Sequence, residues 1–380
     1  MKSPAGKKFK NNNLFLILFS LAILIIIFVG LLSVGQFFPT EYNRADAEIK
    51  KVTEAIKEVK DNILTFDTKA YDAKMLQLAN YPAPKVSTTT AATSTATATA
   101  TTTPVKPNLW PVKTAYPKAG ALLPFNRIIA YYGNFYSTKM GVLGEYSEEV
   151  VIQKLRDEMA KWKEADPTTP TVPAINYIAI TAQGTAQPDG KYRLRMPDSQ
   201  IDIAVSLAKK VDGIVILDIQ IGLSDLKTEL PLLEKYLKMP NVHLGLDPEF
   251  AMHNGQKPGD YVGSFDAAEI NYTANYLAKL VKDNDLPPKV LIVHRFTEDM
   301  VTNYKKITPL PEVQIVMDMD GWGSQARKFN TYRQVIQLEP VQFTGFKLFY
   351  KNDFREPGSR ILTPAEIMEL QPRPSFIQYQ

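Results

Sequence analysis

Apolar and polar residues alternate with two different periods along the C-terminal two thirds of the chain. Short apolar runs, typical of buried strands, are separated by stretches in which apolar residues recur every three or four positions, as in helices. We expect strands at residues 127–133, 175–183, 213–220, 241–249, 289–296, 312–320, 342–350 and 375–379. We expect helices at about 147–165, 199–211, 225–239, 265–284, 297–307, 324–336 and 363–370.

This strict alternation of strand and helix predicts the fold class. Eight strands, each followed by a helix except the last, favour an α/β fold, a (β/α)8 TIM-like barrel over residues 125–380. The alternative is an open doubly wound sheet. That fold would carry a glycine-rich phosphate loop after its first strand, and the segment YYGNFYSTKMG does not have the GxGxxG spacing.

The N-terminal part predicts a membrane anchor. A basic tail at residues 1–13 precedes an uncharged apolar run at residues 14–34, and roughly 20 apolar residues suffice to span a bilayer. The preceding lysines predict a cytoplasmic N-terminus, and so a single-pass cell-membrane protein whose C-terminal domain lies outside the cytoplasm. The alternative is a cleaved signal peptide ending near Gly35, although the run is longer than a typical signal-peptide core.

Two further segments separate the predicted anchor from the barrel. Residues 41–80 have a helical pattern, with apolar positions every three or four residues from Ile49 to Phe66. The pattern predicts either a coiled-coil stalk, which would make the protein a homo-oligomer through residues 49–66, or an amphipathic helix lying against its own domain. Residues 82–107 consist largely of Thr, Ala, Ser and Pro, which is typical of a linker.

Composition excludes several classes of function. The net charge of +4 comes from the lysines of the N-terminal tail, so the other 40 basic residues balance the 40 acidic ones and nothing indicates nucleic-acid binding. The chain has no cysteine, which excludes disulfides and thiolate chemistry. Three histidines without an HExxH motif argue against a zinc hydrolase.

Charged residues recur at the ends of the predicted strands. In a (β/α)8 barrel, this is the end at which active sites are built. The candidate catalytic residues are Asp218, Asp247, Glu249, Asp318 and Asp320. The candidate substrate-binding residues are Tyr132, Gln183, Gln220, His294, Arg295, Trp322 and Lys347.

The twofold period of a strand predicts which of these side chains point into the barrel. Val242, Leu244 and Leu246 form one apolar face of the fourth strand, which turns Asp247 and Glu249 inward. The same phasing turns Asp218 and Gln220 inward on the third strand and Asp318 and Asp320 inward on the sixth, and it puts Lys347 and Phe349 on one face of the seventh. The fifth strand leaves His294 and Arg295 as alternatives, because both of its faces are apolar.

Paired carboxylates in a cleft suit glycoside hydrolysis, in which one acts as the acid and the other as base or nucleophile. The Asp247-Pro248-Glu249 segment resembles the acidic strand-four ends of chitinase-type and lysozyme-type barrels. That resemblance implies Glu249 as the acid, Asp247 as the partner that tunes its pKa, and Asp318 or Asp320 as a further acidic helper. The DGxDxDxE run of chitinases is absent.

A longer resemblance covers most of residues 213–380. The stretches LDPEF, GSFDAAEIN, HRFTEDMVTN, DMDGWG and FIQYQ are similar to a group of exported bacterial, glycoside-hydrolase-like barrel proteins of unassigned activity. It implies the fold and an exported location, but no reaction.

We therefore expect a domain that binds or hydrolyses a cell-envelope or extracellular polysaccharide such as peptidoglycan, without a cofactor. Three alternatives remain open. The same acids suit a divalent cation, and hence a metal-dependent phosphoester hydrolase. The domain could be a non-catalytic glycan-binding module. The charged residues could also form an ion-pair network with only a structural role.

Overall fold

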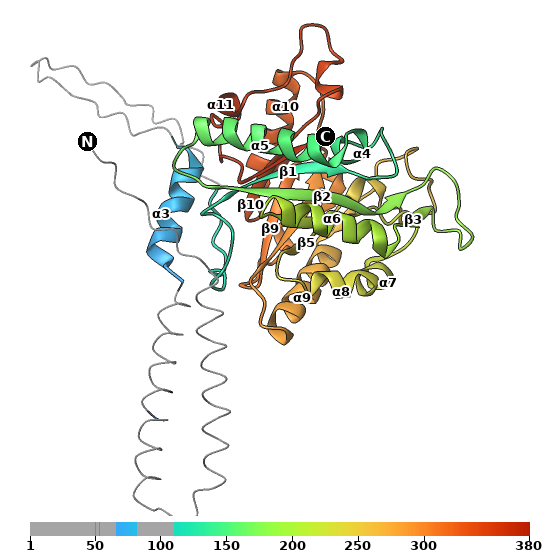
Figure 1. Cartoon of the computed structure of the whole chain (residues 1–380), viewed down its shortest axis with the longest axis horizontal. Coiled ribbons are helices and arrows are strands. Elements are labelled where there is room, and N and C mark those ends of the chain that lie inside the picture. The colour runs from blue at the N-terminus through green and yellow to red at the C-terminus, as the bar shows by residue number, and fades with distance from the viewer. Residues whose placement is uncertain (1–49, 51–52, 54–65, 82–109) are drawn as a thin grey trace, which may run out of the picture. The chain divides into compact units, whose positions relative to one another are not determined.

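Eight parallel strands close into a barrel in the computed structural model of the chain, which describes Lys50, Thr53 and residues 66–81 and 110–380 (Figure 1). The first strand pairs with both the second and the last, so the sheet has no open edge between them. The barrel strands are β1 (Arg127–Gly133), β2 (Thr171–Ala182), β4 (Ile214–Ile219), β5 (Val242–Leu246), β7 (Lys289–Arg295), β9 (Val313–Met319), β10 (Phe343–Leu348) and β11 (Phe376–Tyr379). The predicted barrel is confirmed, and the doubly wound alternative is wrong.

Both faces of each barrel strand are buried, as expected where helices cover the outside and side chains fill the inside. On β5 the predicted outward residues Val242, Leu244 and Leu246 belong to the large outer core between strands and helices. Ile216 of β4 and Val316 of β9 belong to a separate inner core. The predicted phases of β4, β5 and β9 are therefore confirmed.

The helices follow the predicted order. They are α4 (Val142–Glu145), α5 (Glu148–Ala165), α6 (Asp198–Lys210), α7 (Leu226–Glu229), α8 (Glu234–Leu237), α9 (Ala267–Asp283), α10 (Gln325–Tyr332) and α11 (Pro364–Ile367). Asp266 caps α9 and Thr363 caps α11, each in a full capping box. A short strand β3 (Arg193–Arg195), which the sequence pattern did not predict, pairs antiparallel with β2.

The predicted helix at residues 297–307 is wrong. The segment forms two 3-10 turns, Glu298–Met300 and Tyr304–Lys306, on either side of β8 (Val301–Thr302), which pairs with β6 (Phe265–Asp266). Two of its carbonyl oxygens, those of Thr297 and Glu298, accept hydrogen bonds from Arg295 at 3.1 and 2.7 Å. The carbonyls of this segment thus bond to a strand side chain instead of a helix backbone.

A helix that precedes the barrel in sequence closes its interior at the N-terminal ends of the strands. Asp67 caps α3 (Thr68–Ala79), accepting a hydrogen bond from Ala70 N at 2.9 Å. Tyr71, Met75 and Leu78 are buried in the inner core of the barrel. The compact unit therefore runs from Phe66 to Gln380 rather than from residue 125. The last part of the segment predicted as a stalk is thus a helix packed on the barrel domain.

Several predictions fall on other parts of the chain. The basic tail 1–13, the apolar run 14–34, the linker 82–107 and nearly all of the seam 49–66 lie outside the described residues. Within the part of the chain that the structure describes, no helix combines the length and apolar character needed to cross a membrane.

Candidate active site

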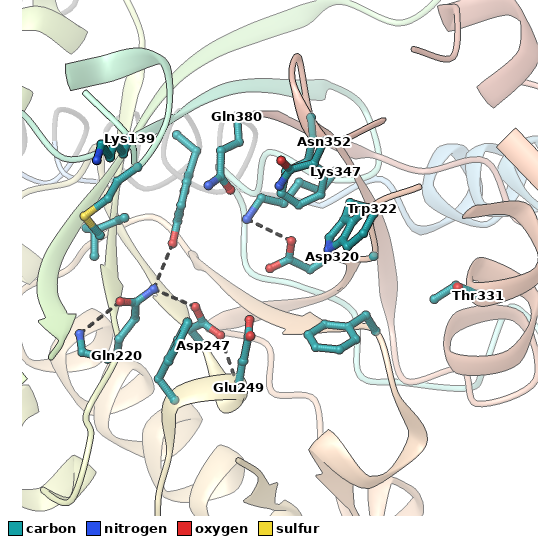
Figure 2. A pocket seen from close by; sticks show the side chains of 18 of the residues that line it. Lys139, Gln220, Asp247, Glu249, Asp320, Trp322, Thr331, Lys347, Asn352 and Gln380 are labelled. Atoms are coloured by element: carbon teal, nitrogen blue, oxygen red, sulfur yellow. Dashed lines mark hydrogen bonds and ion pairs between the residues drawn. The ribbon is translucent and has the colours of Figure 1, made fainter. Parts of the chain in front are cut away.

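A cavity of about 580 Å³ opens at the C-terminal ends of the barrel strands (Figure 2). Asp247 and Glu249 reach it from the end of β5, Asp320 from the end of β9 and Lys347 from β10. Figure 2 shows these side chains facing the same space, with Asp247 and Glu249 on one wall and Asp320 with Lys347 on another. The phase argument from the sequence thus predicted the side chains that gather here.

A buried histidine lies at the floor of this cavity and joins three of the carboxylates. His294 Nε2 lies 2.7 Å from Asp218 Oδ2, and His294 Nδ1 lies 3.2 Å from Asp318 Oδ2 and 3.5 Å from Asp320 Oδ2. Burial opposes a charge on His294, but Asp218, Asp318 and Asp320 outweigh it and raise the pKa of the imidazole well above its usual value. His294 is therefore an imidazolium that donates from both nitrogens.

The two deepest carboxylates respond differently to this cation. Burial works to raise the pKa of Asp218, but the charge and hydrogen bond of His294, with Lys347 and Asn176, lower it. For Asp318 burial is the stronger effect and raises the pKa, against the hydrogen bond from His294. The buried charges of Asp218 and His294 thus compensate each other.

Two glycines make room for these buried carboxyl groups. A Cβ atom on Gly245 would lie 2.8 Å from Asp218 Oδ2, and one on Gly345 would lie 2.5 Å from Asp318 Oδ1. At both distances the aspartate carboxyl group would have to move to make room for a side chain. Gly245 lies beside Asp218 on the neighbouring strand, and Gly345 lies beside Asp318. The absence of a side chain at these two positions leaves space for the carboxyl groups.

Lys347 balances the charge of Asp320 on the cavity wall. Its Nζ lies 2.9 Å from Asp320 Oδ1 and 4.1 Å from the centre of the Tyr132 ring. Burial works to lower the pKa of Lys347, but Asp320 and Asp247 outweigh it and raise the pKa. The lysine therefore stays charged in its ion pair with Asp320.

The other two acids, Asp247 and Glu249, have no cation in hydrogen-bond contact among the residues that the structure describes. Gln220 Nε2 donates to Asp247 Oδ2 at 2.9 Å, while Ala182 N donates to Gln220 Oε1 at 3.1 Å and fixes the amide. Burial and the neighbouring acids raise the pKa of Asp247 to about 7 and that of Glu249 to about 8. The Glu249 carboxyl group faces the cavity and makes no hydrogen bond or ion pair to any described residue. With a pKa of about 8, this acid is mostly protonated at neutral pH.

An exposed tryptophan stands at the rim of the cavity. Trp322 is 39% exposed, and the guanidinium groups of Arg327 and Arg355 lie 5.9 and 5.3 Å from its ring centre. The loop that carries it is fixed by a buried ion pair. Lys328 Nζ contacts Gly321 O at 3.0 Å and both carboxylate oxygens of Asp353, and Asp353 in turn accepts from Gly323 N at 3.1 Å.

Seven of the predicted site residues line the cavity, and three lie directly beneath it. Those lining it are Tyr132, Gln220, Asp247, Glu249, Asp320, Trp322 and Lys347. Those beneath it are Asp218, His294 and Asp318.

Arg295 and Gln183 do not belong to the site. Arg295 points to the outer face of β7, where it pairs with Glu339 and donates to Val335 O at 3.2 Å. The inner position on that strand is taken by His294, in phase with Val290 and Ile292 of the inner core. Gln183 lies beyond the end of β2, and its amide donates to the carbonyl oxygens of Thr181 and Ala182 instead of facing the cavity.

Two residues that support the site were not predicted. Asn176 Nδ2 donates to Asp218 Oδ2 at 3.1 Å, and its Oδ1 accepts from Gln378 Nε2 at 2.9 Å. Both are polar residues in otherwise apolar strands, INYIAI and FIQY, and a polar residue in such a strand is itself a signal of an internal hydrogen bond.

The described part of the chain holds no group of three or more His, Asp or Glu side chains arranged to bind a metal ion. Asp218, Asp318 and Asp320 lie around His294, and Asp320 also pairs with Lys347.

Comparisons with known proteins give structural neighbours only. No family model and no curated protein sequence matches the chain. Among solved structures, a mutant form of Thermotoga maritima Cel5A with cellobiose is similar over 67% of this chain and 88% of its own, with 12% identity and a TM-score of 0.37. A ruminal GH26 endo-β-1,4-mannanase is similar over 67% of this chain and 58% of its own, with 13% identity and a TM-score of 0.31.

A third neighbour has a different chemistry. Burkholderia cenocepacia dihydropteroate synthase is similar over 67% of this chain and 85% of its own, with 9% identity and a TM-score of 0.32. Likenesses of this size carry no argument about activity. Function must be argued from the side chains of the cavity itself.

Proposed function

We propose that the cavity binds a polysaccharide chain and hydrolyses its glycosidic bonds, with Glu249 as the proton donor. The observation that carries the proposal is the contrast between two acids on facing walls. Glu249 is uncharged at neutral pH and has no protein partner among the described residues, whereas Asp320 is paired with the charged Lys347. Glycosidases use one carboxylic acid and one carboxylate in this way.

The protonated Glu249 and the lysine-paired Asp320 suggest different roles for the two acids. Glu249 would protonate the oxygen of the leaving sugar, and Asp247 beside it keeps the proton on Glu249 by adding negative charge. Asp320 would stabilise the positive charge that develops on the sugar ring, as nucleophile or as the base for a water molecule. Proton NMR of the first product anomer distinguishes retention from inversion.

Several of the remaining lining residues suit a hydroxyl-rich chain. Trp322 and Phe296 offer aromatic surfaces, and Gln220 and Asn352 offer amides that can both donate and accept hydrogen bonds. Aromatic faces with a few polar groups that fix orientation are typical of small-molecule sites. This combination supports a sugar substrate.

The proposed function is tested by turnover of defined oligosaccharides. We expect Glu249→Gln to abolish the release of reducing ends while leaving the fold intact, and the exposed control Glu369→Gln to retain full activity. Wild-type activity should fall as the pH rises past about 8, because Glu249 then loses the proton it has to donate. Tight oligosaccharide binding without turnover in the wild type would instead identify a non-catalytic glycan-binding module.

We further propose that the domain works outside the cytoplasm, attached to the cell membrane by residues 14–34. The support is the length of the apolar run and the lysines that precede it. Protease added to intact spheroplasts should degrade the barrel domain, and carbonate washing should leave the chain in the membrane fraction. Protection from the protease, or release by the wash, would contradict this topology.

A further inference from the structure

A second, smaller cavity of about 50 Å³ adjoins the main one. The two share Lys139, Phe349, Asn352 and Gln380 in their linings. The smaller cavity lies between the loop after β1 and the loop after β10, which are both next to β11 in the barrel. Figure 2 shows Lys139, Asn352 and Gln380 along the side of the main cavity away from Asp247 and Glu249.

The charges around this side pocket are mainly positive. Lys139 is exposed and forms no ion pair with any described residue. Lys351 is paired with Glu145 at 2.8 Å, and both residues also line the pocket. Among the described residues that line the side pocket, two lysines thus face one glutamate, and Lys139 is the lysine without an ion pair.

The main cavity offers less to an anion. Asp320 pairs with Lys347 and balances its charge, and Asp247 and Glu249 add two carboxyl groups, of which Glu249 is protonated at neutral pH. A negative group placed beside Asp320 and Asp247 would gain little from the paired Lys347, whereas one placed in the side pocket would gain the unpaired charge of Lys139.

The size of the side pocket limits what it can hold. One water molecule needs about 10–15 Å³ of such volume, so the pocket has room for a few water molecules or one small polyatomic group. A carboxylate or phosphate is of that size, and a whole sugar ring is not.

Resting on the proposed function, we propose that the substrate is an acidic polysaccharide, and that the side pocket receives an anionic substituent of a sugar bound in the main cavity. Lys139 is the principal partner of this group. Amide hydrogen bonds from Asn352 and Gln380 complete the recognition.

The test compares matched tetrasaccharides of glucose, mannose and N-acetylglucosamine, each as the neutral, the uronate and the phosphorylated form. Binding to the full chain is measured by calorimetry at low and high salt, with the wild type and with Lys139→Gln, Lys139→Arg and the control Lys279→Gln on α9. Lys279 pairs with Asp283 and lines neither cavity.

We expect an acidic form to bind at least tenfold more tightly than its neutral counterpart, and the advantage to shrink at high salt. Lys139→Gln should remove the advantage, while Lys139→Arg and Lys279→Gln should keep it. The relative affinities of the uronate and phosphate forms identify which substituent the site takes. Equal binding of neutral and acidic forms, or an advantage that survives Lys139→Gln, would overturn the proposal.

Product analysis of the same mixtures separates this proposal from the hydrolase proposal. Acidic oligosaccharides that bind through Lys139 but are not cleaved would refute hydrolysis and support the anion site. Cleavage of neutral chains without preference for acidic ones would refute the anion site and support hydrolysis. Failure of every form to bind would refute both.

Discussion

Burying Glu249 should lower the free energy of unfolding at a pH where the free acid would be ionised, and this effect can be measured without a substrate. Its carboxyl group has a pKa of about 8 in the folded chain, against an ordinary value of 4.5. Each pKa unit corresponds to 1.36 kcal/mol, so ionising this acid in the folded state costs up to about 5 kcal/mol relative to the unfolded chain. Water that enters the cavity reduces this, and we expect roughly 2–4 kcal/mol.

The sign of the pH dependence follows from where the proton is held. At pH 4 Glu249 is largely protonated in both states and contributes little. As the pH rises from 4.5 to 8, the unfolded chain releases the proton while the folded chain keeps it, so the folded state is progressively destabilised. The neutral amide of Glu249→Gln removes this penalty, and the variant should exceed the wild type in stability only at high pH.

Urea unfolding at pH 4.5, 7 and 9 measures this difference. We expect the stability of Glu249→Gln relative to the wild type to increase by roughly 2–4 kcal/mol between pH 4.5 and 9. The exposed control Glu369→Gln should show no such trend. A difference that does not change with pH, or that favours the wild type at pH 9, would show that Glu249 is not a buried neutral acid.

Three further substitutions probe the floor and rim of the cavity. Asp218→Asn leaves the buried charge of His294 without its closest partner, and should lower the free energy of unfolding by about 3–5 kcal/mol in urea titrations; a loss below about 1 kcal/mol would contradict the charged pair. Gly345→Ala places a Cβ 2.5 Å from Asp318 Oδ1 and should cost about 1–3 kcal/mol, unless the carboxyl group can move away freely. Trp322→Ala should raise KM about tenfold with an unchanged kcat and melting temperature, because the ring is 39% exposed and contributes little to the core; a change in kcat alone would place the ring in the chemical step.

The barrel could be predicted because its strands carry strong and repeated signals. Apolar runs such as IVILDI and VQIVMDM are too short for helices and are bounded by residues that start or end helices. The twofold phase then turned Asp218 and Asp318 inward correctly, because each is the first polar residue after its apolar run and the following residue, Ile219 or Met319, is apolar. Local pattern and global fold agree in these segments.

The rest of the site depends on contacts between segments far apart in the chain. The strand KVLIVHR is apolar on both faces, so its sequence cannot decide between His294 and Arg295; the ion pair of Arg295 with Glu339 decides it. The buried pair of Lys328 with Asp353 joins two loops, and neither loop has a period from which a partner could be read. A charged or polar side chain in an apolar segment can be recognised from the sequence as needing a partner. When that partner lies on another strand or loop, the sequence does not identify it.

The packing of α3 on the barrel determines what happens when the chain is cleaved between them. Thr/Ala-rich tracts usually separate domains, yet here the segment at residues 82–109 lies between two parts of one folding unit, α3 on one side and the barrel on the other. Asn80 donates to the carbonyl oxygens of Met368 and Leu370, and Arg373 N donates to Leu78 O at 2.7 Å. A protease nick within that tract should therefore yield two polypeptides that co-migrate on gel filtration until denaturant separates them.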